Sequence, residues 1–591
     1  MCGILGVFPC VKYSNVKIES FINSLNHRGP DNQDHLFHEN LLLAHSRLSI
    51  IDIKSNSNQP FSSCDNRYSI VFNGEITNYL SLKVELEKYG VKFRTESDTE
   101  VLLNLLIKWG ESALEKLDGM FAFAFLDKLQ NTLILSRDFL GVKPLYYSLK
   151  NNELIFSSEV KSFNKLNVYD KNPNWKELYL TFGFIPDNQT TIDGVYSLPK
   201  GSFLKFDLNT HDFVIKSYLQ ETHDCQINNE IESKNLISQK LIKSVRDNLI
   251  SDAPLGVFLS GGIDSSLLVL LANLSGQKEL RTVSVNFDVD EYNERNYQEI
   301  ILENINNNKH TDFIVTKDIF FNEINDILNK MDQPSCDGIN SYFVSLAAKK
   351  AGLKTVLSGV GGDELFGGYP SFKRASFLPL LNSLPNFFLT LLSKFSNYFS
   401  RLEFLKIEGN YKEYLFYRGI FNISQISQIL EKPRKLVLNT INSLKLNPKN
   451  REKLRRVSDL ELNIYMQNQL LKDTDCFSMA NSLEVRVPFL NKDFIKTLNK
   501  INPEIRFAKP GTKSLLISTF QNILPKEIVN RKKSGFVMPF DYWLRSDINK
   551  TKSLLGNNPK SDIILDQFIN KKIHWSRLWM LIVLNHFETN E

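Results

Sequence analysis

The sequence predicts two domains of different fold class: an α+β domain of stacked layers, followed by an α/β domain built on a parallel sheet. The chain of 591 residues is too long for a single domain, because domains average about 150 residues. In residues 1–160, apolar strand-like runs come in groups with helical stretches between them, which indicates α+β layers. From residue 236 onward strands and helices alternate, which indicates parallel βαβ units.

The first domain contains both strand and helix signals. Its strand-like runs are β-rich and end in turn residues; they lie at 41–52, 67–74, 120–127, 132–138 and 153–159, with a last hairpin at 197–208. Two stretches have apolar residues at helical spacing and stop at a glycine, residues 81–90 and 98–110.

Residues 220–235 are polar and poor in large apolar side chains, so they are expected to form a linker. We place the domain boundary there, with domains at 1–222 and 223–591. After the linker the pattern predicts helices at 237–250, 266–275 and 295–306, strands at 254–260, 281–288 and 355–357, and mostly helices from residue 370 onward.

Composition excludes several classes of protein. Hydrophobic residues make up 42% and charged residues 23%, as in globular proteins, which excludes a largely disordered, collagen-like or coiled-coil chain. The net charge of +5 demands neither nucleic acid nor a membrane surface as a partner. The six cysteines form no CxxC pair and no signal peptide is evident, so a cytoplasmic location is expected. The most apolar stretch, residues 377–399, is broken by prolines, which favours buried or interface helices over membrane contact.

Cys2 is the first candidate catalytic residue. Removal of Met1 would give Cys2 a free α-amino group, which titrates near about pH 8 and can act as general base for the thiol. One residue would then supply both nucleophile and base. Taken alone, Cys2 can equally be an ordinary buried cysteine.

Further motifs in the first domain favour the catalytic interpretation. They are CGILG at 2–6, HRGPD at 27–31, RLSIID at 47–52, FNGEITNY at 72–79 and SDTEVLL at 97–103. In this order and spacing they resemble the glutaminase domain of amidotransferases with an N-terminal nucleophile (Ntn). The resemblance implies a four-layer αββα Ntn-hydrolase sandwich.

The same resemblance implies a role for each matched residue. Cys2 attacks the side-chain amide of glutamine, and the Asn73 side chain with the Gly74 backbone N–H forms the oxyanion hole. Arg47 pairs with the α-carboxylate of glutamine. Asp98, with Glu75 nearby, holds the α-ammonium group.

In the second domain, a glycine turn lies between a predicted buried strand and a helix. The turn, SGGIDSS at 260–266, offers two glycines, hydroxyl groups and a helix N-terminus to an anion such as a phosphate chain. It lacks the lysine of a GxxxxGK[ST] loop, so transfer of a γ-phosphoryl group is not indicated. The turn resembles the loop of ATP pyrophosphatases, which split ATP between the α- and β-phosphates.

A second glycine turn, SGVGGDELFGGY at 358–369, and the stretch from Asp475 to Leu490 resemble asparagine synthetases. The resemblance implies ATP as a substrate, Mg²⁺ held by Asp264 and Asp363, and a catalytic Lys513 near the phosphates. The ATP-binding positions that it implies are Leu259, Ser260, Gly261, Gly262, Asp264, Ser265, Val285, Ser358 and Gly359.

The leading interpretation is glutamine-dependent synthesis of asparagine. Glutamine hydrolysis supplies ammonia, ATP adenylates the side-chain carboxylate of aspartate, and ammonia displaces AMP after passing between the sites internally. The expected partners are therefore glutamine, aspartate and ATP, without nucleic acid or membrane; the sequence gives no oligomeric state, and a homodimer is compatible with it.

Val360 leaves the acceptor open, because asparagine synthetases of the better-known type carry a glutamate there. Cys476 and Asn481 are smaller departures from the family pattern. One alternative is amidation of another carboxylate, such as a uronic-acid sugar in polysaccharide synthesis. A second is a regulator that binds amino acids or nucleotides without synthesis, against which the intact Cys2, Asn73 and Asp264 argue.

Overall fold

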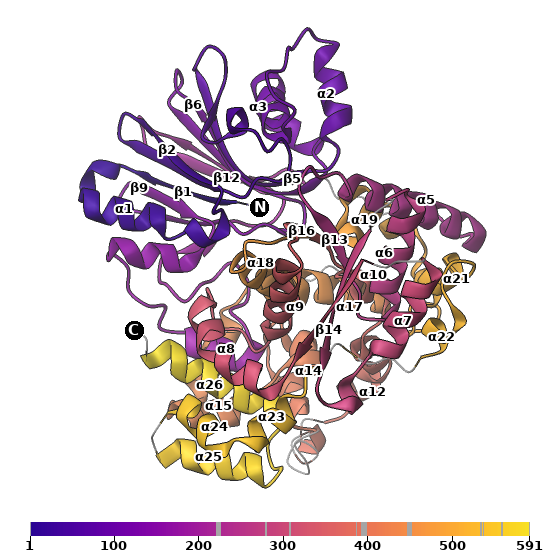
Figure 1. Ribbon diagram of the computed structural model, residues 1–591. Helices are drawn as coiled ribbons and strands as arrows, with labels where there is room; N and C mark the ends of the chain where they lie inside the picture. The colour runs from indigo at the N-terminus through magenta and orange to yellow at the C-terminus, as the bar shows by residue number, and fades with distance from the viewer. Residues whose placement is uncertain are drawn as a thin grey trace.

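The computed structural model describes most of the chain (Figure 1). The described residues are 2–219, 226–277, 280–305, 309–385, 387–389, 391, 399–445, 452–531, 535, 537–556 and 559–589. The N-terminus lies where the two domains meet, beside β5 of the first domain (Figure 1).

The first domain contains two six-stranded antiparallel sheets. One has the order β10-β8-β9-β1-β3-β2, with β1 Gly3–Phe8, β2 Asn32–His38, β3 Leu41–Arg47, β8 Tyr146–Lys150, β9 Glu153–Ser157 and β10 Tyr196–Ser197. The other has the order β12-β11-β7-β6-β5-β4, with β4 Phe61–Ser62, β5 Tyr68–Ile76, β6 Gly119–Asp127, β7 Thr132–Arg137, β11 Ser202–Asp207 and β12 Phe213–Ser217.

Strand β6 shows why these sheets stack. Its alternate residues Ala122, Ala124 and Leu126 pack in the core between the two sheets, while Phe121 and Phe123 pack with helices α2 (Tyr79–Glu87) and α3 (Asp98–Trp109). Both faces of the strand are therefore apolar, as expected for a strand in an inner layer.

Helix α1 (Asn15–Asn23) covers the outer face of the other sheet. The order helix, sheet, sheet, helix is the predicted four-layer αββα sandwich, and that prediction is confirmed.

The second domain is built on a five-stranded parallel sheet of order β15-β14-β13-β16-β17. The strands are β13 Leu255–Phe258, β14 Arg281–Phe287, β15 His310–Val315, β16 Thr355–Leu357 and β17 Glu484–Arg486. Helices α5 (Glu230–Asn248) and α6 (Ile263–Leu274) pack on one face, and α8 (Lys317–Lys330) and α9 (Ile339–Lys350) pack on the other. The predicted α/β class is confirmed.

Additional helices surround this sheet and fill the lower part of the molecule (Figure 1). They are α4 Trp175–Phe182, α7 Arg295–Asn304, α10 Gly362–Phe366, α11 Pro370–Arg374, α12 Leu378–Asn382, α14 Lys412–Arg418, α15 Ile423–Leu430, α16 Arg434–Asn442, α17 Lys453–Leu460, the π-helical segment η9 Glu461–Leu470, α18 Leu471–Met479, α19 Lys492–Lys500, α20 Pro503–Arg506, α21 Ser514–Thr519, α22 Lys526–Asn530, α23 Phe540–Ser546, α24 Ile548–Leu555, α25 Pro559–Ile569 and α26 Trp575–Thr589.

The linker prediction was wrong in part. Helix α5 begins at Glu230, because the side chain of Asn229 accepts hydrogen bonds from the backbone of Ile231 and Glu232 and caps the helix. The polar residues up to 235 are the solvated first turns of this helix. The predicted boundary at 222/223 lies outside the described residues.

Two other local predictions need correction. The strand predicted over 41–52 ends at Arg47, because the chain then turns so that backbone carbonyls meet the Arg47 guanidinium. Helices α1 and α4 were not predicted.

Much of the apolar stretch 377–399 lies outside the described residues, namely 386, 390 and 392–398. Among the helices that the structure describes, none is long and apolar enough to cross a membrane.

Candidate active sites

The predicted glutamine-site residues lie together around one pocket at the start of β1. The pocket has an empty volume of ≈ 390 Å³, and its lining includes Cys2, Arg47, Gly74, Glu75 and Asp98. The fold thus joins the chain start, the end of β3, the end of β5 and the N-terminus of α3.

Asn73 contacts the predicted nucleophile directly. Its Oδ1 accepts a hydrogen bond from the backbone N of Cys2 at 3.0 Å. Its Nδ2 is buried and has no hydrogen-bond partner among the described residues. A buried donor without a partner is costly, and an anion formed beside Cys2 would satisfy it.

The Cys2 thiol is 7% exposed, and its Sγ lies 4.0 Å from the carbonyl of Leu48. Burial raises the pKa of this thiol, while the charge of Arg47 acts in the opposite direction. A base is therefore needed to generate the thiolate at neutral pH. Met1 lies outside the described residues, so the role of a free α-amine stays a prediction.

Gly74 occupies a position that only glycine fits. Its φ is +154°, and a Cβ atom there would lie 2.1 Å from the carbonyl oxygen of Met120 on β6. The close pairing of β5 with β6 sets this backbone.

Arg47 and Asp98 supply opposite charges to the pocket. The Arg47 guanidinium donates to the carbonyls of Lys54 at 2.9 Å and Asp52 at 2.6 Å, which fixes its orientation. Asp98 is 6% exposed and accepts from the backbone N of Ile76 at 3.1 Å. Burial raises the pKa of Asp98 to about 6.

The second domain also contributes to this pocket, which the sequence reasoning missed. Glu484 of β17 is part of the lining. Arg486, two residues on, is fully buried and pairs with Glu484 at 2.6 Å and with Glu75 of the first domain at 2.9 Å. The sequence signal that could have predicted this contribution is the Glu-x-Arg pattern of Glu484 and Arg486, within the stretch 475–490. Glu75 therefore faces Arg486 through one oxygen, and its other oxygen, Oε1, is buried without a hydrogen-bond partner in the described part of the chain.

The predicted ATP-site residues gather at the carboxyl end of the parallel sheet, where open α/β sheets bind ligands. The turn after β13 holds Ser260, whose hydroxyl lies 2.9 Å from that of Ser265 on α6. The turn after β16 packs against α6 so closely that a Cβ on Gly359 would lie 2.9 Å from the Cβ of Asp264. Gly261 has φ of +70° and backs onto Tyr297.

The remaining predicted ATP-binding positions lie at the same edge of the parallel sheet. Leu259 and Val285 are buried, and Ser358 donates its backbone N–H to the carbonyl of Arg486 at 2.8 Å. Val360 is half-buried and packs against the apolar core on the α5–α6 face.

Lys513 joins the two aspartates. Its Nζ contacts a carboxylate oxygen of Asp264 and lies 2.8 Å from Oδ1 of Asp363. Burial alone would lower the pKa of Lys513, but the two carboxylates outweigh burial and raise it. Two carboxylates that already converge on one cation have the oxygen chemistry that Mg²⁺ takes together with phosphate oxygens, so these residues fit the implied metal.

Comparisons with known proteins match both parts of the chain to families. Residues 1–219 match the family described as glutamine amidotransferase domain, and residues 236–577 match the family described as asparagine synthase. The chain is 32% identical to asparagine synthetase [glutamine-hydrolyzing] 1 of Bacillus subtilis, over 99% of this chain and 96% of that protein. The chain belongs to the glutamine-hydrolysing asparagine synthetase family.

Other relatives are more distant. A putative asparagine synthetase [glutamine-hydrolyzing] of Mycobacterium tuberculosis is 29% identical, over 95% of this chain and 91% of that protein. The amidase chry2 of Gibberella zeae is 25% identical, over 91% of this chain and 87% of that protein.

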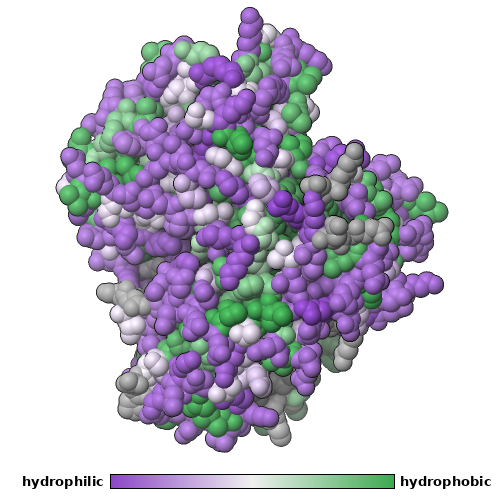
Figure 2. Space-filling view, in the orientation of Figure 1, coloured by the Kyte–Doolittle hydropathy of each residue, from purple (hydrophilic) through white to green (hydrophobic). Residues whose placement is uncertain are grey.

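In this member of the asparagine synthetase family, a buried arginine links the predicted nucleophile to the second domain. Arg28 donates from Nε to the carbonyl of Cys2 at 3.1 Å and pairs with Glu159 at 3.0 Å and with Asp475 at 2.7 Å. Asp475 belongs to α18, so the ion pair crosses the domain boundary. The surface shows an indentation between the domains on the right of the view, between α2 and α5 (Figure 2).

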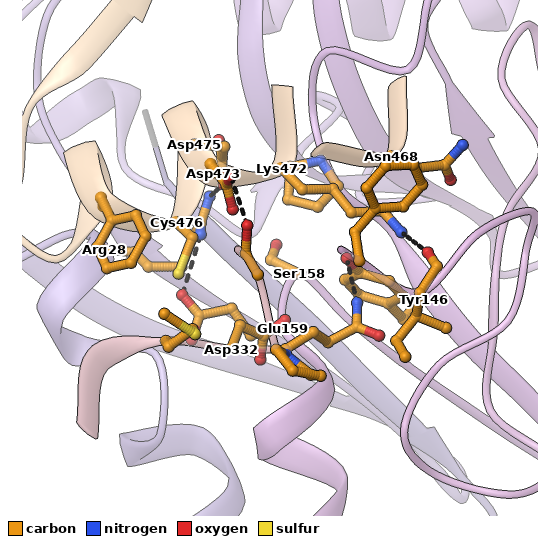
Figure 3. Close-up of a pocket in the computed structure, with 18 residues that line it drawn as sticks. Arg28, Tyr146, Ser158, Glu159, Asp332, Asn468, Lys472, Asp473, Asp475 and Cys476 are labelled. Carbon is orange, nitrogen blue, oxygen red and sulfur yellow. Dashed lines mark hydrogen bonds and ion pairs between the residues drawn. The ribbon is translucent and has the colours of Figure 1, made fainter. Parts of the chain in front are cut away.

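A pocket lies beside Arg28, between the two domains (Figure 3). It has an empty volume of ≈ 500 Å³ and is lined by Tyr146 and Glu159 of the first domain and by Asp332, Lys472 and Asp473 of the second, among others. Burial lowers the pKa of Lys472 to about 7. The pocket therefore mixes carboxylates with an amine that changes charge near neutral pH.

Proposed function

We propose that the protein makes asparagine from aspartate, with glutamine as the nitrogen donor and ATP as the activating substrate. The amidotransferase domain would comprise residues 1–222 and the synthetase domain residues 223–591. The observation that carries the proposal is the buried Nδ2 of Asn73 beside Cys2, which has no hydrogen-bond partner among the described residues, in a pocket whose lining includes Glu484 of the synthetase domain.

In the first domain, Arg47 and Asp98 hold the two charges of glutamine and present its side-chain amide to Cys2. Attack by the thiolate produces a tetrahedral oxyanion, which Asn73 Nδ2 and the Gly74 backbone N–H would stabilise. Ammonia leaves, and water then releases glutamate from the thioester.

In the second domain, the turn at 260–266 would hold the pyrophosphate of ATP, and the apolar Leu259 and Val285 would contact the adenosine. The acceptor carboxylate attacks the α-phosphorus, so pyrophosphate leaves and an acyl-adenylate forms. Lys513 would stabilise the negative charge of the departing pyrophosphate. When bound, Mg²⁺ at Asp264 and Asp363 would neutralise charge on the phosphates.

Ammonia must reach the acyl-adenylate without entering bulk water, where at neutral pH it is mostly protonated and no longer nucleophilic. Lys143 is buried between the domains and lies 3.7 Å from Asp475, beside the interface pocket. We place the passage of ammonia along this interface, from Cys2 past Arg28 and Asp475.

A second acceptor class remains a candidate on two observations. Val360 puts an apolar side chain where the family pattern expects a carboxylate, and a relative of this chain is named an amidase. Amidation of another carboxylate, such as that of a uronic-acid sugar, would use the same adenylation chemistry.

The test separates nitrogen supply from acceptor choice. Cys2→Ala should abolish synthesis with glutamine and retain synthesis with ammonium salts, because the ATP site is in the other domain. AMP and pyrophosphate are measured with aspartate and with a panel of other carboxylates. Retained glutamine-dependent turnover in Cys2→Ala would refute the nucleophile assignment. Release of ADP and phosphate, or no response to aspartate, would refute asparagine synthesis by this route.

A further inference from the structure

Arg486 is buried where the second domain meets the glutamine pocket, and the proposed mechanism gives it no role. It belongs to β17, the edge strand of the parallel sheet, where it pairs with Leu357 of β16. Its guanidinium donates to the carbonyl of Asn248 at 2.8 Å and to that of Ile250 at 2.5 Å, at the end of helix α5. Arg486 is therefore a fixed part of the second domain.

The other donors of this guanidinium hold two carboxylates, one from each domain. Nε donates to Glu484 of the second domain at 2.6 Å, and Nη2 donates to Glu75 of the first domain at 2.9 Å. Both carboxylates are buried and belong to the lining of the pocket that contains Cys2. A planar guanidinium fixes its partners in direction as well as in distance. Arg486 thus orients Glu75 from across the domain boundary.

The guanidinium occupies only one oxygen of Glu75. The other, Oε1, is buried and accepts no hydrogen bond from any residue that the structure describes. A buried carboxylate oxygen without a donor is costly, so a ligand that brings a donor is expected to bind there. Burial raises the pKa of Glu75, while the Arg486 charge acts to lower it. Arg486 therefore favours the charged form of Glu75, which attracts a cationic donor.

The other charged groups of the pocket indicate which donor this is. Arg47 and Asp98 belong to the same lining, so the pocket offers a cation and carboxylates to one ligand. An α-amino acid carries a carboxylate for Arg47 and an ammonium group with three donors. Asp98 already accepts from the backbone N of Ile76 at 3.1 Å through Oδ2. A second carboxylate oxygen is therefore needed to satisfy the ammonium group.

We propose that Arg486 is a positioning residue of the glutamine site, which turns Oε1 of Glu75 toward the α-ammonium group of the bound glutamine. Arg486 acts through Glu75 and not on glutamine itself. The inference rests on the proposed glutamine hydrolysis and adds to it that the first domain selects an α-amino acid with the help of a residue from the second. Such selectivity arises because a buried group built for a charged partner rejects an analogue that lacks it.

The test compares glutamine with glutaric acid monoamide, which has hydrogen in place of the α-ammonium group. Ammonia release is measured with each, or inhibition where the monoamide does not turn over. Glu75→Gln removes the charge, and Arg486→Lys keeps a charge that cannot bridge both carboxylates. Each variant should raise KM for glutamine about 10- to 100-fold. The constant for the monoamide should stay unchanged, and so should kcat for glutamine, because the ammonium group binds equally in the ground and transition states.

A double variant tests whether Arg486 acts through Glu75. In the Glu75→Gln background, Arg486→Lys should raise KM for glutamine no further, because the carboxylate that it orients is already gone. Additive effects of the two substitutions would refute the positioning role.

Lys354→Gln is the matched control. It breaks another ion pair between the two domains, with Asp31 at 2.7 Å, and neither residue belongs to the pocket lining. It should change no constant for glutamine or the monoamide. Ammonium-driven synthesis reports in every variant that the chain is folded. If Arg486→Lys does not fold, Glu75→Asp withdraws the carboxylate without removing Arg486 and should raise KM for glutamine alone.

The outcomes are distinguishable. An equal rise in the constants for glutamine and the monoamide, in Glu75→Gln or in Arg486→Lys, would refute the inference and leave glutamine hydrolysis standing. A wild type with the same KM for both compounds would refute it as well. If the wild type releases no ammonia from glutamine, or Cys2→Ala still releases it, the proposed function fails and the inference fails with it.

Discussion

Replacement of Asn73 tests the oxyanion hole most directly. Asn73→Ala removes one of the two donors that we propose beside Cys2, its Nδ2, and leaves the other, the proposed Gly74 backbone N–H. The loss of one such donor costs about 2.7–4 kcal/mol, or about 10²–10³-fold in kcat. KM for glutamine should change little, because the donor acts on charge that develops only in the transition state.

Asn73 also accepts from the backbone of Cys2, so one variant is not sufficient. Asn73→Asp keeps that acceptor and removes the donor, and it should be at least as slow as Asn73→Ala. The assay is release of glutamate from glutamine, with ammonium-driven synthesis measured in parallel. Asn26→Ala, on the exposed surface of the same domain, is the matched control. A fall in kcat of less than about fivefold in both variants, against the 10²–10³ expected, would refute this role for Asn73.

Four further predictions follow from the structure. Because burial raises the pKa of Asp98 to about 6, its negative charge is lost as the pH falls through that value; kcat/KM for glutamine should drop below about pH 6, and Asp98→Asn should be slow at every pH without this limb. Asp363→Asn should abolish AMP and pyrophosphate release while glutamine hydrolysis continues; equal loss of both activities would contradict separate sites. Val360→Glu should preserve or raise aspartate-dependent pyrophosphate release, since a general base contributes about 10²–10⁴-fold; a fall would favour a larger acceptor. Arg486→Met leaves Glu75 buried without its counter-charge and should lower unfolding stability in urea by about 3–5 kcal/mol, whereas Arg67→Met, whose pair is partly exposed, should cost less than about 1 kcal/mol.

Local pattern alone predicted the elements that carry the chemistry. The turns after β13 and β16 were expected between strand and helix, because glycines, hydroxyls and an apolar run are neighbours in the sequence. Gly74 could likewise be assigned from its motif, and the close approach of Met120 supplies the steric reason. The linker prediction failed at residues 230–235, because a capped helix with a solvated face has the same polar composition as a loop.

The tertiary structure decided which distant residues share a site. Arg486 meets Glu75 across 411 positions, Arg28 meets Asp475 across 447, and Lys513 meets Asp264 across 249. No periodicity or turn signal records such pairs, because their energy comes from burial and charge pairing that exist only after the sheets and helices have packed.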